Sequence, residues 1–600
     1  MNRIHRLILA LLLLGFGASA GKAASQLELD RDLKCSVRAG LNEYVREGGM
    51  VPLVIRFRNS GDARKIQVRS LGKIKASATF HIPAHRTARR CLCVPFAESR
   101  LTGFEFRDGE SGRSLAKTSA GNRLQFSGRR YGSRKQDLVS VLLTESSSYS
   151  VNKDFSQPYE LKRSTVSPFF LPDRWQGYSG IDILIIDYKV WRDPGFDPDP
   201  VIQWTAMGGM SLLLDVPEEK KTNVVREVAQ KAPFVATNRR KADSDSGEDF
   251  HWVRHTSLEG IKFGIGAVIF VSKAQISSSH SGFFRRRGLT VGPISEKSST
   301  HSHGGYMRHR YSHHRTSTAG HPKIPGTEKA PFWPVFLALT AFSLLVGPVG
   351  WWYLVARRKQ GLLYYISAPA LCILVMGGVI VADFFHEGFR PYASCYAVRF
   401  LDQQVKKSIN VSQFGIYDPF VRTRGIKGST KELAYSPEWG SSDMRNLKLE
   451  WREDGIHYPG LLETRRKMWF SRQAIGRDRR RLLIGEKDGK YWVENHLGCK
   501  LKRAYIHYGN TFLKVGRIEP GKKVAAQVCR GVDMASFQRL FTSIQKETIL
   551  RKARPLHDIW ANRLSKGNAY VAEASDGFEG HIWLHRFRPK KTVHLIFGVM

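Results

Sequence analysis

Long apolar runs break the polar pattern of this chain at three places. The first, residues 7–16, follows Arg3 and Arg6 and precedes the small residues Ala18 to Ala20. It is too short to span a bilayer of about 30 Å. The pattern therefore predicts a secretory signal peptide over 1–24, cleaved after Ala20 or Ala24. An uncleaved anchor is the alternative, and either places residue 30 onward outside the cytoplasm.

The other two apolar runs predict transmembrane helices at 332–355 and 362–385. Each is 24 residues long, against the roughly 20 that a spanning helix needs. The loop between them, 356–361, contains Arg357, Arg358 and Lys359. Short basic loops stay in the cytoplasm, so the first helix runs inward and the second outward. Pro348 and Pro369 are expected to kink the helices, and a buried globular hairpin is the alternative.

Alternating and continuous apolar segments divide the rest of the chain. Residues 28–130 predict a β-sandwich, with short strands separated by turns. Residues 136–272 predict an α/β domain with a parallel sheet, because apolar strands alternate with helical stretches such as 200–207. Residues 390–600 predict a mainly-β domain with one clear helix at 533–550. The expected strands lie at 51–58, 66–69, 78–82, 91–94, 138–143, 181–186, 212–214, 265–271, 392–400, 447–451, 491–495, 504–508 and 591–596.

Composition adds a linker and a strong positive charge. Residues 274–330 are rich in Ser, Gly, Arg and His, which predicts a disordered tether. The formal net charge is +41. With nearly all of it outside, anionic lipid or glycan is the expected counterpart, and nucleic acid is excluded. A merely basic, soluble surface is the alternative.

Seven cysteines are compatible with disulfides outside the cytoplasm. Cys372 falls within the second apolar run, and three of the others precede the helices while three follow them. We expect one disulfide in each half of the chain, and the spacing leaves the partners open.

Histidines and basic residues form two local clusters. The histidine tract can bind Zn, Ni or Cu, but it also suits a plain linker, or a contact with an anionic surface as imidazoles protonate. It comprises His301, His303, His309, His313 and His314. The basic cluster is interleaved with aromatic residues and predicts contact with an anionic surface, with an ordinary charged surface as the alternative. It includes Arg465, Arg466, Lys467, Arg479, Arg480 and Arg481.

Three polar residues of the α/β domain invite a chemical interpretation. Asp187 follows a core strand and Asp182 precedes it, at the kind of position where α/β sheets place ligands. A carboxylate there can bind a ligand, or it can cap the next segment. Ser211 follows Gly208 and Gly209, but strand continues after it, so a nucleophile elbow is not predicted.

Several motifs stand out, at 49–53, 58–61, 178–187, 204–209, 345–369 and 495–521. Together they resemble a family of bacterial envelope proteins. That family combines a signal peptide, a β-sandwich, a domain similar to class I glutamine amidotransferases, two helices and an outer β domain. The resemblance implies this architecture, while an amidotransferase nucleophile is missing, because no cysteine lies between Cys93 and Cys372.

These expectations combine into one hypothesis. The chain is a multidomain protein of the cytoplasmic membrane, with both large domains outside and other envelope membrane proteins as partners. It acts as a scaffold or senses a ligand, without an enzymatic centre. An envelope hydrolase or transferase using the α/β domain is the first alternative. A metal-handling protein using the histidine tract is the second.

Overall fold

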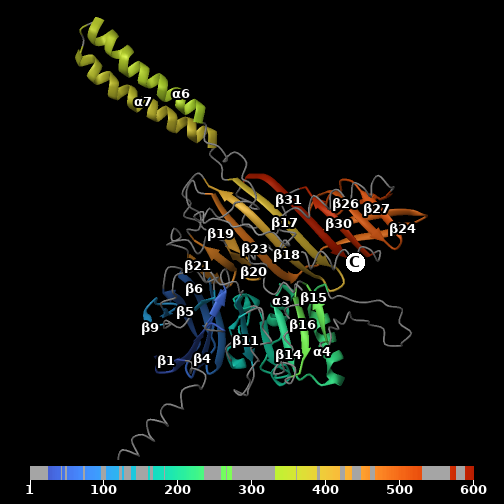
Figure 1. Ribbon diagram of the computed structural model, residues 1–600. Coiled ribbons are helices and arrows are strands. Elements are labelled where there is room, and N and C mark those ends of the chain that lie inside the picture. Colours follow the sequence, from blue (N-terminus) through green and yellow to red (C-terminus); the bar gives the residue numbers. More distant parts are fainter. Residues whose placement is uncertain are drawn as a thin grey trace, which may run out of the picture.

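The protein is mostly β-structure arranged in several sheets, with two long apolar helices standing apart from them (Figure 1). The predicted signal peptide, the linker and the helix expected at 533–550 lie outside the described residues. This computed structural model describes residues 25–41, 44–46, 50–71, 75–95, 103–119, 125–127, 137–143, 160–162, 166–181, 183–234, 259–264, 266–272, 332–357, 359, 361–387, 392–418, 426–435, 448–459, 467–529, 568–575 and 588–600.

Two sheets pack face to face near the N-terminus. Phe57 in β4 and Phe106 in β8 meet edge to face, with ring centroids 6.5 Å apart. The predicted strands at 51–58, 66–69, 78–82 and 91–94 fall within β4, β5, β6 and β7. The first sheet has the order β1 (Ser25–Asp30), β2 (Leu33–Ala39), β4 (Met50–Asn59) and β7 (Thr87–Pro95), and a small parallel pair joins β3 (Tyr44–Arg46) to β10 (Gln125–Ser127).

The second of these sheets contains strands from both ends of the chain. Strand β21 pairs in parallel with β6, from Lys448 beside Lys75 to Trp451 beside Ala78. This pairing was not predicted, and it joins segments that lie before and after the apolar helices. The order is β19 (Ile426–Gly428), β22 (Gly455–Tyr458), β21 (Lys448–Arg452), β6 (Lys75–Ile82), β5 (Arg64–Leu71), β8 (Gly103–Asp108) and β9 (Ser114–Ser119).

A six-stranded sheet occupies the predicted α/β region. Its strands are parallel except β15, which confirms the prediction of a parallel sheet here. Every position of β13 and β14 is buried, which explains their continuous apolar runs. The order is β12 (Glu160–Lys162), β11 (Asp137–Leu143), β13 (Ile183–Asp187), β14 (Met210–Leu214), β16 (Gly266–Val271) and β15 (Glu259–Phe263). The helices are η2 (Pro168–Phe170), η3 (Trp175–Tyr178), α2 (Tyr188–Trp191), α3 (Asp199–Ala206) and α4 (Glu218–Lys231).

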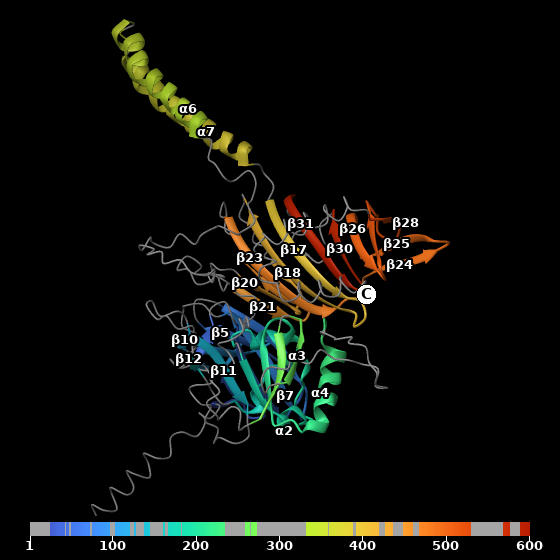
Figure 2. The same cartoon turned by 45° about the vertical axis from the view of Figure 1, so that its right-hand side comes forward.

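The C-terminal part is built around a nine-stranded sheet that lies between the apolar helices and the N-terminal sheets (Figure 2). The predicted strands here all fall on observed ones. The order is β20 (Glu432–Tyr435), β23 (Lys467–Arg477), β18 (Lys407–Tyr417), β17 (Tyr392–Asp402), β31 (Arg588–Val599), β30 (Asn568–Ala574), β26 (Leu501–Tyr508), β27 (Thr511–Val515) and β29 (Gln527–Val528).

A small three-stranded sheet packs beside the far end of the nine-stranded one. Asp488 and Gly489 join its first two strands, and both have positive φ, of 54° and 71°. Two such residues favour a tight turn that matches the strand twist, so this Asp-Gly pair fixes the hairpin register. The order is β24 (Arg481–Lys487), β25 (Lys490–His496) and β28 (Lys523–Ala525).

The two apolar helices form a hairpin. The first begins as α6 (Phe332–Leu344) and continues as the π-helical segments η4 (Leu345–Val349) and η5 (Trp351–Arg357). It has non-helical backbone at Gly347, immediately before Pro348, where a kink was expected. The second, α7 (Gly361–Glu387), continues through Pro369. Tyr364 donates a hydrogen bond to the Val346 carbonyl across the hairpin, at 3.1 Å.

Both helices are long and apolar enough to cross a membrane. Their most apolar windows, Leu339–Arg357 and Gly361–Gly378, are 0% buried in the rest of the protein. A buried globular hairpin, the alternative considered from the sequence, does not fit this exposure. Only residues 388–391 separate α7 from β17. Five chain steps span at most about 18 Å, so the start of β17 lies near the end of the hairpin.

The expected disulfides are not formed, and this prediction is wrong. None of the seven cysteines, all of which lie among the described residues, is in a disulfide. In the first half, β4 separates Cys35 from Cys91 and Cys93 within one sheet. In the second half, Cys395 and Cys499 belong to two different hydrophobic cores. Sequence counting cannot reveal this separation, because it depends on how distant strands pair.

Candidate functional site

The order of the strands in the six-stranded sheet reverses at β11, which is typical of ligand-binding α/β folds. Strand β12 lies on one side of β11, whereas β13, β14 and β16 follow on the other side. Ligands of such sheets bind beyond the carboxyl ends of the strands next to this point. Strand β13 ends at Asp187, and β14 is followed by Asp215. Two carboxylates therefore lie at the ends of adjacent parallel strands.

Asp187 has a structural task at this edge. Its side chain is 8% exposed and accepts a hydrogen bond from the backbone N–H of Lys189, at 3.0 Å. It thereby caps the short helix α2. This is the plainer of the two roles considered from the sequence, and it leaves a ligand role untested. Asp182, the other predicted residue, lies outside the described residues.

Asp215 is a feature of this edge that sequence reasoning missed. It lies between β14 and α4 and has φ of +51°, a left-handed conformation that few residues other than Gly, Asn and Asp adopt readily. A strand, a left-handed residue and a helix is also the backbone arrangement of a nucleophile elbow. Here the residue is an exposed carboxylate. The Asp-Val-Pro sequence after an apolar strand was the signal available.

Ser211 is not placed to act as a nucleophile. It is 0% exposed within β14, and its hydroxyl shares a 2.7 Å hydrogen bond with the hydroxyl of Thr205 in α3. Both hydroxyls are satisfied internally, so the pair stabilises the packing of α3 on the sheet.

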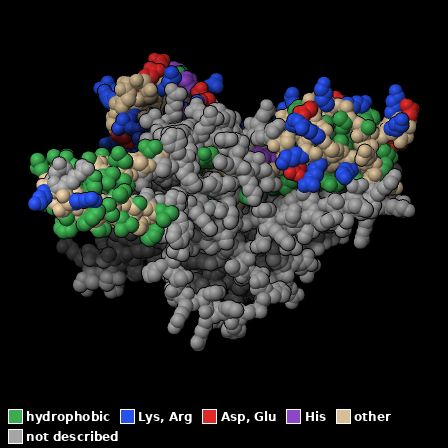
Figure 3. Space-filling view, turned by 90° about the horizontal axis from the view of Figure 1, so that it is seen from above, with side chains coloured by type: hydrophobic (Ala, Val, Ile, Leu, Met, Phe, Trp, Pro, Cys, Tyr) green, Lys and Arg blue, Asp and Glu red, His purple; other side chains and the backbone are tan. Residues whose placement is uncertain are grey.

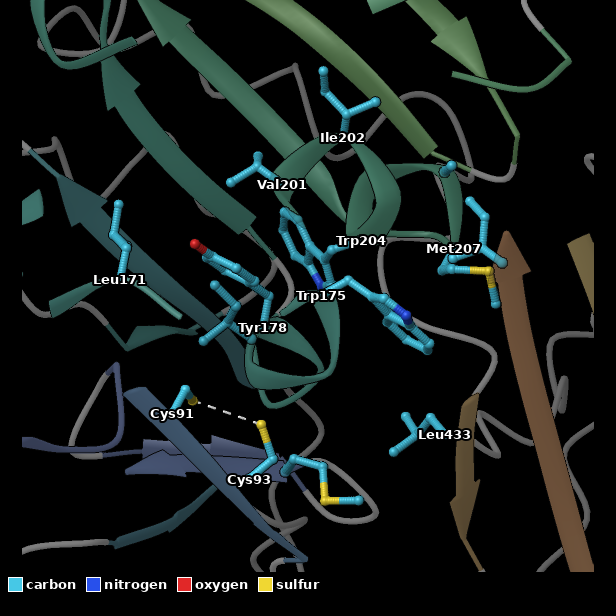
Figure 4. Close-up of a cluster of buried hydrophobic side chains, with 14 of the residues drawn as sticks. Cys91, Cys93, Leu171, Trp175, Tyr178, Val201, Ile202, Trp204, Met207 and Leu433 are labelled. Carbon is cyan, nitrogen blue, oxygen red and sulfur yellow. Dashed lines mark hydrogen bonds between the residues drawn. The ribbon is translucent and has the colours of Figure 1, made fainter. Parts of the chain in front are cut away.

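A second candidate site lies where three of the sheets meet. The segment 172–179 connects the N-terminal sheet, the six-stranded sheet and the nine-stranded sheet. Figure 4 shows side chains from all three parts converging: Trp175 and Tyr178 from this segment, Cys91 and Cys93 from β7, Trp204 and Met207 from α3 and its end, and Leu433 from β20. We call segment 172–179 the junction segment.

Directional hydrogen bonds hold the junction segment on two sides. The Ser179 hydroxyl accepts from the Met50 N–H at 2.9 Å, and Gln176 donates its amide to the carbonyls of Thr430 and Glu432 at 2.8 and 3.2 Å. Gly177 packs so closely that a Cβ there would lie 2.5 Å from the Cβ of Pro172. The segment therefore links β4 to β20, across more than 250 residues of chain.

Trp451 closes the same region from the C-terminal side. Its ring is 5% exposed, and its indole N–H donates to the Cys93 carbonyl at 2.9 Å. The guanidinium of Arg174 lies over the ring, 5.1 Å from the centroid. Burial raises the pKa of the neighbouring Asp173, against the opposing effect of Arg174. These contacts attach β21 to the N-terminal sheet and to the junction segment at once.

The nine-stranded sheet carries a buried layer of charge on the face opposite to Leu433. Arg399 donates to Asn410 at 2.6 Å and lies 3.5 Å from the Asp478 carboxylate. Burial lowers the pKa of Arg399 to about 9. Burial by itself raises the pKa of Asp478, but Arg399 and Arg480 outweigh it and hold that pKa below its ordinary value. Arg472 and Glu432 form a second buried ion pair through two hydrogen bonds.

His594 lies next to this charged layer. The residue pairs with Ala397 of β17, two positions from Arg399, and is 3% exposed. Burial lowers its pKa to about 4, and the positive charges of Arg399 and Lys502 act in the same direction. The imidazole is therefore neutral at physiological pH and does not serve as a switch there.

The predicted basic cluster at 465–481 is divided by the fold. Lys467 begins β23, whereas Arg479, Arg480 and Arg481 follow its other end. Ten residue steps of extended strand separate these ends by about 33 Å. Arg480 is also bound to Asp478 at 3.0 Å. Lys467 and residues 479–481 thus lie at opposite ends of β23, and Arg465 and Arg466 lie outside the described residues.

The predicted metal site cannot be placed, because the histidine tract lies outside the described residues. Elsewhere, the described part of the chain contains no group of three or more His, Cys, Asp or Glu side chains able to hold a metal ion.

Comparison with known proteins leaves the family open. No protein-family model matches the chain, and no curated protein matches it either. The class of protein that the fold defines is therefore a coarse one: a β-rich, multi-sheet protein with two helices able to cross a membrane.

Proposed function

We propose that the chain is a non-enzymatic integral membrane protein of a bacterial envelope, whose outer body acts as a scaffold or ligand-sensing module. In this proposal the hairpin lies in the cytoplasmic membrane and everything else lies outside. The resemblance to amidotransferase-like envelope proteins is part of the same proposal. The mainly parallel sheet of six strands, whose strand order reverses at β11, is compatible with this resemblance.

One observation carries the proposal: the parts of the chain before and after the hairpin fold into one body. Strand β6 pairs with β21, Trp451 bonds to Cys93, and Gln176 bonds to the Glu432 carbonyl of β20. Two parts that share a sheet lie on the same side of any membrane that the hairpin crosses. The short basic turn between the helices then faces the opposite side, which favours an inward turn and an outer body.

The joints within this body are extensive. The Phe234 N–H donates to the Asp402 carboxylate at 2.9 Å, and the rings of Phe234 and Phe400 meet edge to face at 6.1 Å. Lys407 donates a hydrogen bond to the Lys231 carbonyl. The α/β part is thus bound to β17 and β18 independently of the pairing between β6 and β21. A body joined at several places suits a scaffold, which must present partners in fixed positions.

In-cell crosslinking followed by mass spectrometry tests this function. The tagged full chain is compared with a variant lacking residues 274–330 and with Asp187→Ala and Asp215→Asn variants. We expect a reproducible set of envelope proteins, unchanged in the two carboxylate variants. Recovery of the protein alone, together with a loss of cellular phenotype in either carboxylate variant, would favour the envelope hydrolase or transferase.

The metal-handling alternative has its own test. Deleting residues 300–321 removes the predicted ligands His301, His303, His309, His313 and His314. A scaffold keeps its partners after this deletion. Loss of metal resistance or uptake with unchanged partners would support metal handling instead.

A further inference from the structure

The three-stranded sheet β24–β25–β28 has one face in a core and one face outward. Strand register places Leu482, Ile484 and Val493 on the inner face, where they are in contact with the core beneath. The outer face has a different composition. It carries Arg481, Leu483, Lys487, Lys490, Trp492, Glu494, His496 and Lys523.

The outer face is strongly positive. Arg481, Lys487, Lys490 and Lys523 are exposed, whereas its one carboxylate, Glu494, is bound by His496 at 2.7 Å. The surrounding segment 481–529 has ten Lys or Arg and four Asp or Glu, a net charge of +6. Figure 3, viewed from the side of the hairpin, shows Lys and Arg side chains gathered over the lobe that this segment forms.

A half-exposed tryptophan lies at the centre of these cations. A Cβ on Gly485 would come within 2.3 Å of the Trp492 ring, so the ring lies across the sheet where glycine leaves room. The ammonium of Lys523 lies 3.7 Å from the ring centroid. Tryptophan flanked by lysine is the combination that seats at the headgroup level of a bilayer, where the ring is apolar and the cations meet phosphate.

The hairpin keeps the outer body close to a membrane. If α7 ends at the bilayer surface, the four residues before β17 hold the start of that strand within about 18 Å of it. The lobe is part of the same body, because its core includes Ile596 of β31 and Tyr570 of β30. Ile596 pairs with Arg399, seven positions along β17 from Tyr392, so the lobe packs about 23 Å of strand away from the tethered end. Its cations meet a negative headgroup layer when the outer body is tilted toward the bilayer, and the attraction extends over roughly a Debye length of 8–10 Å.

We propose that the outer face of β24–β25–β28 binds anionic phospholipid headgroups of the membrane in which the hairpin lies. Trp492 enters the interface, and Arg481, Lys487, Lys490 and Lys523 contact the phosphates. The contact fixes the tilt of the outer body relative to the bilayer. The inference depends on the proposed insertion of the hairpin, and it goes beyond the scaffold function by naming a lipid partner.

A lipid photocrosslinking experiment tests this site on the full chain. A benzophenone amino acid replaces Leu483, and the protein is inserted into nanodiscs of phosphatidylcholine alone or with added phosphatidylglycerol. Since each cation near an anionic surface strengthens attraction severalfold, we expect about tenfold more lipid adduct with phosphatidylglycerol. High salt should remove the gain. Failure of the chain to enter nanodiscs at all would count against the proposed function before any lipid preference is measured.

Charge-reversal variants distinguish the site from general basicity. The triple variant Lys487→Glu, Lys490→Glu, Lys523→Glu should lose the gain while melting at the wild-type temperature. The matched control reverses Lys189, Lys220 and Arg226, which are exposed on α2 and α4, and should keep it. Equal adducts in both lipids overturn the proposal. So does crosslinking to lipopolysaccharide or wall phosphate in cell membranes without phosphatidylglycerol adducts.

Discussion

The six-stranded and seven-stranded sheets differ in where their strands come from. The first is formed entirely within residues 137–271, whereas the second joins strands from 64–119 to strands from 426–458. Apolar runs mark four strands of the first in the sequence, β11, β13, β14 and β16. In the second, the C-terminal strands have three to five residues each, and they join the sheet through the pairing of β21 with β6. Sequence reasoning missed the seven-stranded sheet. Because this sheet contains strands from before and after the hairpin, it places both parts of the chain on the same side of any membrane that the hairpin crosses.

The largest effect is expected from removing Trp451, which secures the seven-stranded sheet. Trp451→Ala deletes a buried ring and its bond to Cys93, and should lower the free energy of unfolding by about 4 kcal/mol. Trp451→Phe keeps most of the packing and should cost about 1 kcal/mol. Denaturant unfolding measures both. Similar values for the two variants would show that the ring does not join the halves.

A second change concerns the nine-stranded sheet, which packs against both the six-stranded and the seven-stranded sheet. Glu432→Leu leaves Arg472 without its carboxylate in a buried place, and should lower the free energy of unfolding by about 3 kcal/mol. Adding Arg472→Met removes the buried positive charge of the guanidinium as well. The double variant should therefore be more stable than the single one. A double variant less stable than the single one would show that Arg472 stabilises the sheet even without Glu432.

The pH dependence of stability tests the charged layer. The pKa of His594 is about 4 when folded, below the ordinary value near 6.5. The unfolded chain therefore binds the proton more tightly, and stability falls as pH drops from about 6.5 to 4, by about 2–3 kcal/mol. Above pH 6.5 the contribution is complete.

His594→Gln should flatten the unfolding profile in this window. The lowered pKa of Asp478 causes a further loss at lower pH, and that loss should remain in the variant. An unchanged profile between pH 6.5 and 4 would mean that His594 reaches solvent.

The smallest effect is expected at the carboxyl edge of the six-stranded sheet. Asp187→Ala removes the cap of α2 and should cost about 1 kcal/mol of unfolding free energy. Asp187→Asn can accept the same hydrogen bond and should cost less. Partner capture should be unchanged in both. A complete loss of function without loss of stability would instead assign Asp187 a chemical role.

Sequence alone predicted the local elements well and their long-range pairing poorly. The runs at 138–143 and 183–186 are strands because a sheet buried on both faces needs continuous apolar residues, and that signal is local. By contrast, Trp451 has no apolar run around it, and its partner Cys93 lies 358 residues away. Asp215 was missed because a left-handed backbone is not encoded by residue type alone. Residues 465–481 are close together in the sequence, but β23 lies between Lys467 and Arg479. An extended strand places its two ends far apart, and residue spacing alone does not reveal this.

Cleavage of the chain between its halves tests the central claim most directly. A protease site is engineered into residues 274–330, and isolated membranes are treated with that protease and sedimented. If the halves form one body, the N-terminal fragment should remain with the membranes, and mild denaturant should be needed to release it. Release of that fragment into the soluble fraction on cleavage alone would contradict a single outer body built from both sides of the hairpin.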